Sequence, residues 1–365
     1  MDPSSYLCRI RDSFNKTNNY NKYPVYLPYK KSLNRDIKKI YNIVECSLED
    51  TKNNRRDFST SPYADNLYNP FSNYKGKFMN TDSIILADTD AFFNFTDHVK
   101  GFIIKQDTRD FNFAVLNDGP GGFSEYLQYR LPNSYGYGMT PSVDTDCNCN
   151  CFQEGWSNWN TDVLDMTHFN ITSGASGTGD LNKDYLSFIS HVKKVNAVGV
   201  DLLVIGEDDV QKLSNPYDYI PKLLVSLNVL KVGSTMICKI SNLDNSMFRQ
   251  LLYLTADCYN KISLFKPLAT DLREDIYFLV AEGLNKNNID TIIYLEKLFH
   301  KLSEYKEFCQ NSTSIISEIP KDFNLWIDNY LLEINKYRDY VTEILDYEVA
   351  ALYDTFKCSV IWNLP

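Results

Sequence analysis

Residues 113–127 read FAVLNDGPGGFSEYL, and this stretch is the strongest indicator of the fold. It opens with an apolar run typical of a buried strand, and we expect a helix to begin just after the glycines. Glycine lets the backbone turn tightly and approach a ligand, and the first turn of a helix offers N–H groups without partners inside the helix. The stretch therefore predicts a ligand-binding loop between a strand and a helix, with a purely structural bend as the alternative.

The glycine loop does not carry the two common nucleotide-binding motifs. Its order of glycines is not GxGxxG, and no GK[ST] ending follows it. Dinucleotide and nucleoside triphosphate binding therefore lose their main sequence support.

Short apolar runs alternate with helix-like stretches further along the chain. The runs at 200–205, 234–240 and 276–280 are typical of buried strands, and we expect helices at 218–230 and 244–257. Because strands that alternate with helices form a sheet covered on both faces, the predicted fold class is α/β.

The chain divides into three predicted regions. Residues 76–283 carry the alternating pattern, whereas residues 1–75 are polar and locally basic. Residues 284–365 form a helical extension with amphipathic spacing, and its helices are expected to pack on the α/β unit or, alternatively, to offer a face to a partner. A length of 365 residues fits one large domain with extensions.

The charge balance restricts the kinds of partner. Asp and Glu total 47 and Lys and Arg total 37, which gives a formal net charge of -10 and excludes a polybasic nucleic-acid binder. Other protein subunits are therefore the favoured partners. RNA is expected to meet at most a confined basic patch among tyrosines in the N-terminal region, although an ordinary solvated surface is an equal alternative. The residues of this patch are Lys30, Lys31, Arg35, Lys38 and Lys39.

Cysteine usage and hydropathy point to a reducing, non-membrane setting. The nine cysteines are an odd number, which is typical of free thiols in a cytosol-like compartment, and no run of about 18 apolar residues predicts a membrane span. Cys147, Cys149 and Cys151 are too closely spaced for an ordinary zinc site, so we predict a structural loop and no metal, with a metal-binding cluster as the alternative. The predicted location is cytoplasmic.

The glycine loop resembles the cofactor loop of the FtsJ/RrmJ-type ribose 2′-O-methyltransferases, most closely that of the eukaryotic and viral cap-1 enzymes. Their loop reads close to AGPGGFSEY, and residues 119–126 match GPGGFSEY without a break. Five further segments resemble family motifs in the same order. They are FMN at 78–80, GYGMT at 136–140, GTGDL at 177–181, GSTMICK at 233–239 and LFKP at 264–267. The resemblance covers roughly residues 78–280 and implies a Rossmann-like, S-adenosylmethionine-dependent methyltransferase sheet with helices on both faces.

The resemblance implies a cofactor and the residues that hold it. In this family, S-adenosylmethionine donates a methyl group to the ribose 2′-hydroxyl of the first cap-adjacent nucleotide. Asn80 matches the family Asn near the methionine end, and Asp180 matches the Asp that contacts the adenine. The matching loop residues are Gly119, Pro120, Gly121, Gly122 and Phe123. Val115 departs from the family, because many members carry an acidic residue there.

The catalytic Lys-Asp-Lys-Glu tetrad of the family is matched only in part. Lys239 matches the central Lys, which helps to remove the proton of the ribose hydroxyl. The first Lys falls on Ile85 and the Asp falls on Gly206. The last Glu falls on Asp275, or on Glu274 with a slip of one residue.

Two of the four tetrad positions are therefore degenerate in strict register, although a slip at Gly206 could bring Glu207 or Asp208 near the site. Such losses cost orders of magnitude in rate. We therefore expect a pseudo-methyltransferase that acts as a binding, regulatory or structural subunit of a capping, transcription or particle complex. A composition typical of AT-rich genomes, together with the resemblance to cap methyltransferases, compact forms of which are common in large cytoplasmic viruses, suggests a viral source, hence host cytoplasm or virion. The alternatives are an active RNA 2′-O-methyltransferase that uses Lys239, and a structural protein that binds neither cofactor nor RNA.

Overall fold

The computed structural model of the chain describes most of residues 77–345 and one strand that precedes them. The described residues are 26–29, 77–96, 111–132, 134–141, 159–303, 314–316 and 318–345. The predicted basic patch of the N-terminal region and the cysteines at 147–151 lie outside them.

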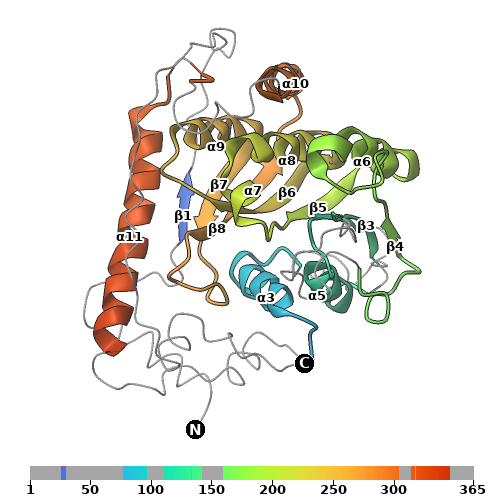
Figure 1. Cartoon of the computed structure of the whole chain (residues 1–365), viewed down its shortest axis with the longest axis horizontal. Coiled ribbons are helices and arrows are strands. Elements are labelled where there is room, and N and C mark those ends of the chain that lie inside the picture. The colour runs from blue at the N-terminus through green and yellow to red at the C-terminus, as the bar shows by residue number, and fades with distance from the viewer. Residues whose placement is uncertain are drawn as a thin grey trace, which may run out of the picture.

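One eight-stranded sheet forms the centre of the molecule, in the order β1-β7-β8-β6-β5-β2-β3-β4 (Figure 1). The strands are β1 (Tyr26–Tyr29), β2 (Asn112–Leu116), β3 (Tyr135–Met139), β4 (Phe169–Ile171), β5 (Val200–Ile205), β6 (Leu230–Ser241), β7 (Tyr259–Phe265) and β8 (Ile276–Leu284). Strands β2 to β6 pair in parallel, whereas β1, β7 and β8 pair antiparallel. All four predicted strand segments lie in this sheet, and the predicted segment at 234–240 is the middle of the longer β6.

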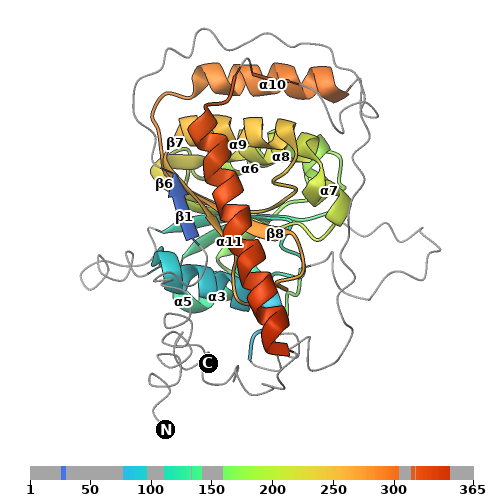
Figure 2. The same cartoon turned by 90° about the vertical axis from the view of Figure 1, so that its left-hand side faces the viewer.

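Helices cover both faces of the sheet. They are α3 (Thr81–Phe93), α5 (Gly122–Arg130), α6 (Leu181–Val195), α7 (Val210–Ser214), α8 (Pro216–Val229), α9 (Ser246–Cys258), α10 (Ile289–Ser303) and α11 (Lys321–Leu345). Helices α3 and α5 lie together on one face, and α6, α8 and α9 lie on the other, with α10 outside α8 (Figures 1 and 2). Helix α11 runs past β1 at the edge of the sheet. This arrangement confirms the predicted α/β fold with helices on both faces.

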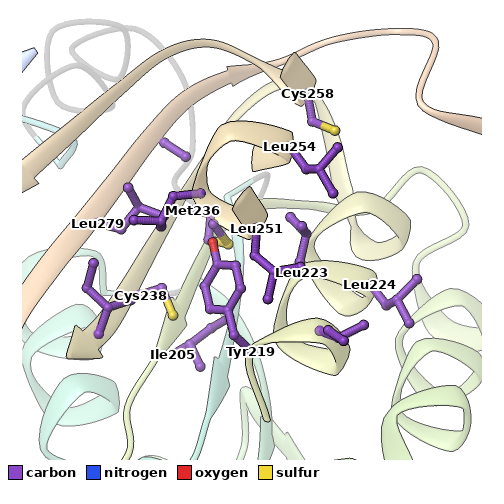
Figure 3. Close-up of a cluster of buried hydrophobic side chains, with 14 of the residues drawn as sticks. Ile205, Tyr219, Leu223, Leu224, Met236, Cys238, Leu251, Leu254, Cys258 and Leu279 are labelled. Carbon is purple, nitrogen blue, oxygen red and sulfur yellow. The ribbon is translucent and has the colours of Figure 1, made fainter. Parts of the chain in front are cut away.

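The core consists of two hydrophobic clusters, one on each face of the sheet. Alternate side chains of β2 serve the two clusters: Ala114 and Leu116 face α6, α8 and α9, while Phe113 and Val115 face α3 and α5. Figure 3 shows part of the larger cluster, where residues of α8, α9 and the central strands pack together. A strand buried on both faces reads as a continuous apolar run, which explains why the sequence pattern located β2 and β5 so well.

Polar side chains begin the helices that surround the sheet edge. Asn80, Asp180 and Asp209 accept hydrogen bonds from the first turns of α3, α6 and α7. Such caps supply partners for N–H groups that a helix cannot satisfy by itself. Within the described residues, no helix has the length and apolar character needed to cross a membrane.

Candidate functional site

The topology selects one edge of the sheet as the ligand-binding edge. After β2 the chain moves outward to β3 and β4, and then returns to the other side of β2 as β5. In open α/β sheets, ligands bind outside the carboxyl ends of the strands at such a reversal. The glycine loop after β2 and the loop at 206–209 after β5 therefore meet at the expected position of the site.

The glycines of the loop leave room for neighbouring side chains to pack directly against its backbone. Gly121 has φ +118°, a conformation that side chains rarely adopt. A Cβ atom on Gly122 would lie 2.0 Å from Oδ1 of Asn80, so the Asn80 side chain can keep this position only with glycine at residue 122. The carboxylate of Asp118 accepts hydrogen bonds from the backbone N–H groups of Phe123 at 2.8 Å and Ser124 at 2.9 Å. The loop and the start of α5 are therefore held as one unit.

Helix α3 is fastened to this loop from the opposite side. The hydroxyl of Ser83 donates to the carbonyl of Gly122 at 2.8 Å, and the N–H of Met79 donates to the Glu125 carboxylate at 2.8 Å. These contacts place Asn80 directly against the glycines. The sequence motif at 78–80 and the glycine loop are thus brought together, as the resemblance implied.

The geometry of this part of the site fits S-adenosylmethionine. Among the described residues, Nδ2 of Asn80 and Oδ1 of Asn117 are buried without a hydrogen-bond partner. Buried polar atoms without partners are costly, so each is suited to a polar group of a ligand. An amide donor beside a cradle of glycines matches the carboxylate end of a methionine tail. When bound there, the cofactor supplies an activated methyl group.

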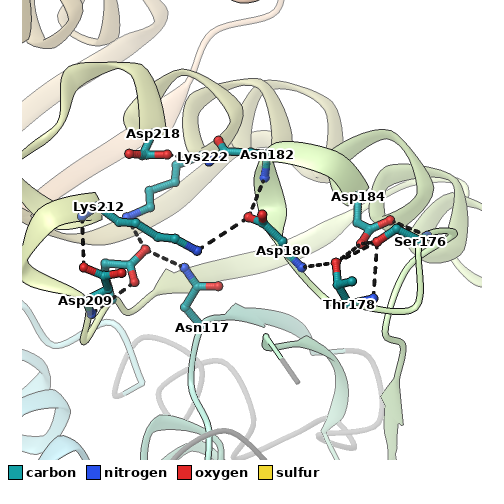
Figure 4. A network of polar contacts seen from close by, with 11 residues as sticks. Asn117, Ser176, Thr178, Asp180, Asn182, Asp184, Asp209, Lys212, Asp218 and Lys222 are labelled. Carbon is teal, nitrogen blue, oxygen red and sulfur yellow. Dashed lines mark hydrogen bonds and ion pairs between the residues drawn. The ribbon is translucent and has the colours of Figure 1, made fainter. Parts of the chain in front are cut away.

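Asp180 lies at the start of α6 and already has two partners. Its carboxylate accepts a hydrogen bond from the N–H of Asn182 at 3.2 Å and lies 3.6 Å from Nζ of Lys212. Figure 4 shows Asn117 beneath this ion pair, so the end of β2 and the start of α6 share one polar network. Asp180 is therefore at the ligand-binding edge. The adenine of a bound cofactor would share the Asp180 carboxylate with Lys212.

The loop after β5 directs two acidic side chains to different cations. Gly206 lies so close to Asn117 that a Cβ atom there would be 2.4 Å from the Asn117 carbonyl oxygen. Glu207 then pairs with buried Lys222 at 3.2 Å, and Nδ2 of Asn117 donates to it at 2.9 Å. Its neighbour along the chain, Asp208, is left to pair with a different lysine.

That lysine is Lys239, whose Nζ lies 3.0 Å from Oδ1 of Asp208. The parallel pairing of Ile205 with Cys238 brings Lys239 beside the end of β5. The Lys239 side chain is only 11% exposed. The structure thus forms a lysine–aspartate pair at the sheet edge, two residues later than strict register with the family places the aspartate.

The charge state of Lys239 is controlled by its acidic surroundings. Burial alone lowers its pKa, but the carboxylates of Asp82 and Asp208 outweigh burial and raise the pKa above the usual lysine value. Burial also raises the pKa of Asp82 to about 6, although the charge of Lys239 opposes that shift. Lys239 therefore rests as an ammonium ion between two carboxyl groups.

Asp82 was not predicted from the sequence. It follows the capping residue Asn80 in the first turn of α3, and its Cβ atom is 2.9 Å from where a Cβ on Gly122 would lie. Its position three residues before Ile85 puts both on the same side of the helix, which was the available signal. Ile85 itself is 6% exposed and belongs to the hydrophobic cluster, so it brings no charge to the site.

The fourth tetrad position lies in the loop before β8. Asp275 forms an ion pair with Arg338 of α11, at 2.8 Å, and accepts a hydrogen bond from the Tyr277 hydroxyl at 3.1 Å. Lys239 is paired across the sheet with Phe278, three residues further along β8. Glu274 meets Arg338 and buried Lys266 through its backbone carbonyl. Lys239 thus forms an ion pair with Asp208 and is influenced electrostatically by Asp82, whereas the described contacts of Asp275 are with Arg338 and Tyr277.

Over the part of the chain that the structure describes, no three His, Cys, Asp or Glu side chains are placed to hold a metal ion. The cysteines at 147–151 lie outside that part, so the prediction about them stays a prediction.

Comparison with protein families gives the same picture as the geometry. A family model described as FtsJ-like methyltransferase matches residues 93–284, which is just over half of the chain. This match includes the glycine loop, Asp180, Asp208, Lys239 and Asp275, whereas α11 and most of α3 lie outside it.

Several curated relatives are cap methyltransferases. The chain is 28% identical over 211 residues to cap-specific mRNA (nucleoside-2′-O-)-methyltransferase 1 of Caenorhabditis elegans, covering 54% of this chain and 22% of that protein. It is 25% identical over 258 residues to the Homo sapiens protein of the same name, covering 65% and 30%. It is also 27% identical over 247 residues to a Caenorhabditis briggsae protein described as an inactive cap-specific methyltransferase 1B, covering 63% and 27%. The matched part thus spans less than a third of each relative.

Among solved structures, Methanococcus jannaschii fibrillarin pre-rRNA processing protein superposes with a TM-score of 0.30 at 11% identity, covering 49% of this chain and 68% of that chain. This superposition is too loose to bear on function. The family model, the sheet topology and the glycine loop agree with one another, and together they imply S-adenosylmethionine as the cofactor. The chain belongs to the FtsJ-like methyltransferase family.

Proposed function

We propose that this protein transfers the methyl group of S-adenosylmethionine to a ribose 2′-hydroxyl of RNA, with capped mRNA as the substrate. The supporting observation is the pair of Lys239 and Asp208, 3.0 Å apart, at the sheet edge beside the glycine loop. It supplies two of the four tetrad functions from neighbouring strands. The relatives named as cap methyltransferases support the choice of substrate.

Lys239 is the group that handles the proton in this proposal. A ribose hydroxyl is a weak nucleophile, so its proton must leave as the new bond forms. Neutral Lys239 accepts that proton, and Asp208 holds the resulting ammonium in place. Because the surrounding carboxylates raise the pKa of Lys239, only a small fraction is neutral near pH 7. Turnover is therefore expected to increase as the pH rises.

A second candidate function is binding without methyl transfer. Ile85 leaves the first tetrad position apolar, and the described contacts of Asp275, at the last position, do not include Lys239. A protein of this kind would bind the cofactor and RNA and serve as a regulatory or structural subunit. Its partners would be other protein subunits of a capping, transcription or particle complex in the cytoplasm or, if the source is viral, in a virion.

One experiment separates the two candidates. Methyl transfer from tritiated S-adenosylmethionine is measured on capped RNA, on uncapped RNA and on capped RNA already methylated at the first ribose. The proposal expects label only on the first substrate and its loss in Lys239→Ala. The matched control is Lys231→Ala, on the same strand, which removes an ion pair with Asp201 at a distance of 2.8 Å.

Calorimetry with S-adenosylmethionine completes the test. Saturable binding with no transfer to any substrate would select the binding function. Absence of binding would reject both candidates. Methyl transfer that persists in Lys239→Ala would support the methyltransferase function but would exclude the proposed role of Lys239.

A further inference from the structure

The loop at 266–275, between β7 and β8, is held by a buried cation at its base. Nζ of Lys266 donates to the carbonyl oxygens of Asp271 at 2.7 Å, Glu274 at 2.8 Å and Ile276 at 2.9 Å. Lys266 is 5% exposed. Three carbonyls converging on one ammonium fix the path of the loop that carries the fourth tetrad position.

A second cation reaches the same loop from the C-terminal helix α11. Nε of Arg338 donates to the carbonyl of Leu272 at 2.6 Å, and Nη2 donates to the carbonyl of Glu274 at 3.0 Å. Nη2 also contacts Oδ1 of Asp275 at 2.8 Å. The planar guanidinium can donate in several directions at once, which an ammonium on a flexible stem cannot do with the same precision.

Arg338 thereby determines where the Asp275 carboxylate lies. Its side chain is 14% exposed, whereas that of Asp275 is 67% exposed. Both described contacts of Asp275, from Arg338 and from the Tyr277 hydroxyl, use Oδ1. The second oxygen is therefore open to a group of the substrate, in the loop that leads into β8, the strand beside Lys239.

The start of the loop is tied to the other side of the site. The N–H of Leu268 donates to Asp88 of α3 at 2.6 Å. The loop therefore spans from α3, which carries Asn80 and Asp82, to α11. Arg338 provides its anchor on the far side, although α11 lies beyond the residues matched by the family model.

We propose that Arg338 is a positioning residue for the active site, holding the loop at 271–275 and presenting the Asp275 carboxylate as the fourth member of the catalytic group. This inference rests on the proposed methyltransferase function. It makes α11 a part of the active site rather than an appended helix. A purely structural Arg338 would fasten α11 to the domain without acting through Asp275.

Hydrogen exchange tests the positioning independently of turnover. In Arg338→Ala, backbone amides at 271–276 are expected to exchange at least tenfold faster, while those of β2 and β5 keep their wild-type rates. The matched control is Lys336→Ala on the same helix, whose ion pair with Glu333 stays within α11. If Arg338→Ala does not fold, Arg338→Lys takes its place, because one ammonium cannot make the same three contacts. Unchanged exchange in the folded variant would overturn the proposal.

A double-mutant cycle then tests the route through Asp275. Arg338→Ala and Asp275→Asn are each expected to lower kcat for methyl transfer about 10- to 100-fold, the range for a misplaced catalytic group, with the KM for S-adenosylmethionine within about twofold of wild type. The double variant is expected to be no slower than the slower single variant. If the loss of kcat in the double variant equals the product of the losses in the two single variants, Arg338 does not act through Asp275, and the proposal is overturned. If the wild type binds cofactor but transfers no methyl group, the proposed function fails by itself, and the exchange result still decides whether Arg338 positions the loop.

Discussion

Replacing Asp208 by Asn tests the central pair of the site, because it removes one charge and keeps the shape of the side chain. At the observed separation of 3.0 Å, the attraction between Lys239 and Asp208 is about 1.4 kcal/mol in bulk water and about 5.5 kcal/mol at an effective dielectric constant of about 20. The Asp208 side chain is 45% exposed, so solvent screens the pair and the lower half of that range applies. Since about 1.4 kcal/mol corresponds to one pKa unit, we expect the pKa of Lys239 to fall by about one to two units.

This shift has two measurable consequences. In protein labelled with ¹³C-lysine, the Cε resonance of Lys239 is expected to titrate about one to two pH units lower in Asp208→Asn than in wild type. In the methyl-transfer assay, the rise of kcat/KM with pH is expected to move to lower pH by the same amount, because the neutral amine forms earlier. The resonance measurement requires no turnover, so it applies to both candidate functions.

Asp209→Asn is the matched control for this prediction. Asp209 is the next carboxylate along the chain, but it caps α7 through the N–H groups of Gln211 and Lys212. Asn is an equally good cap, so neither the fold nor the pKa of Lys239 is expected to change. A Lys239 titration that stays within about 0.3 units of wild type in Asp208→Asn would refute the electrostatic reasoning.

Three further substitutions test the surroundings of the site. Gly122→Ala is expected to abolish measurable S-adenosylmethionine binding in calorimetry, since its Cβ would lie 2.0 Å from an Asn80 oxygen. Gly233→Ala has open space around it but a φ of +86° that strains a side chain, so it should lower stability while the folded protein still binds the cofactor. Lys222→Met is expected to lower the free energy of unfolding in urea by about 3–5 kcal/mol, because it leaves Glu207 buried without its cation. Adding Glu207→Gln removes that unpaired charge and should restore part of the stability. A double variant as unstable as Lys222→Met alone would argue against that cause. Burial raises the pKa of Asp118 to about 8, so folding protonates this carboxyl and wild-type stability should fall as the pH rises from about 4 to 8. Urea unfolding at both ends of this range should show a smaller fall for Asp118→Asn, and an identical fall would contradict the assignment.

Much of the fold could be predicted from the sequence because its signals are local. Central strands buried on both faces appear as apolar runs, and this pattern located β2 and β5 within a residue or two. Residues 119–126 carried enough backbone information to place a tight loop before a helix. Strand β6 begins at Leu230, four residues before the predicted segment, because residues 231–235 are partly exposed and do not form an apolar run.

The candidate site was predictable on the cofactor side and much less so on the catalytic side. Asn80 and the glycines could each be located from a short motif, and the hydrogen bonds from Met79 and Ser83 to the loop region bring the two motifs together. The partner of Lys239 was left open between Glu207 and Asp208. The choice depends on Lys222, fifteen residues further along the chain, which pairs with Glu207.

The sequence by itself determined the class of sheet and the position of the glycine loop, because these follow from short-range patterns of apolar residues and glycines. The identity of the central lysine, Lys239, was implied by the resemblance of residues 233–239 to a family motif. Only the tertiary structure decided which charges surround that lysine. Asp82 comes from α3, Asp208 comes from the loop after β5, and Arg338 of α11 reaches Asp275 across 63 residues of the chain. The strength of a charge pair depends on distance and burial, and both are set by which chain segments meet at the sheet edge.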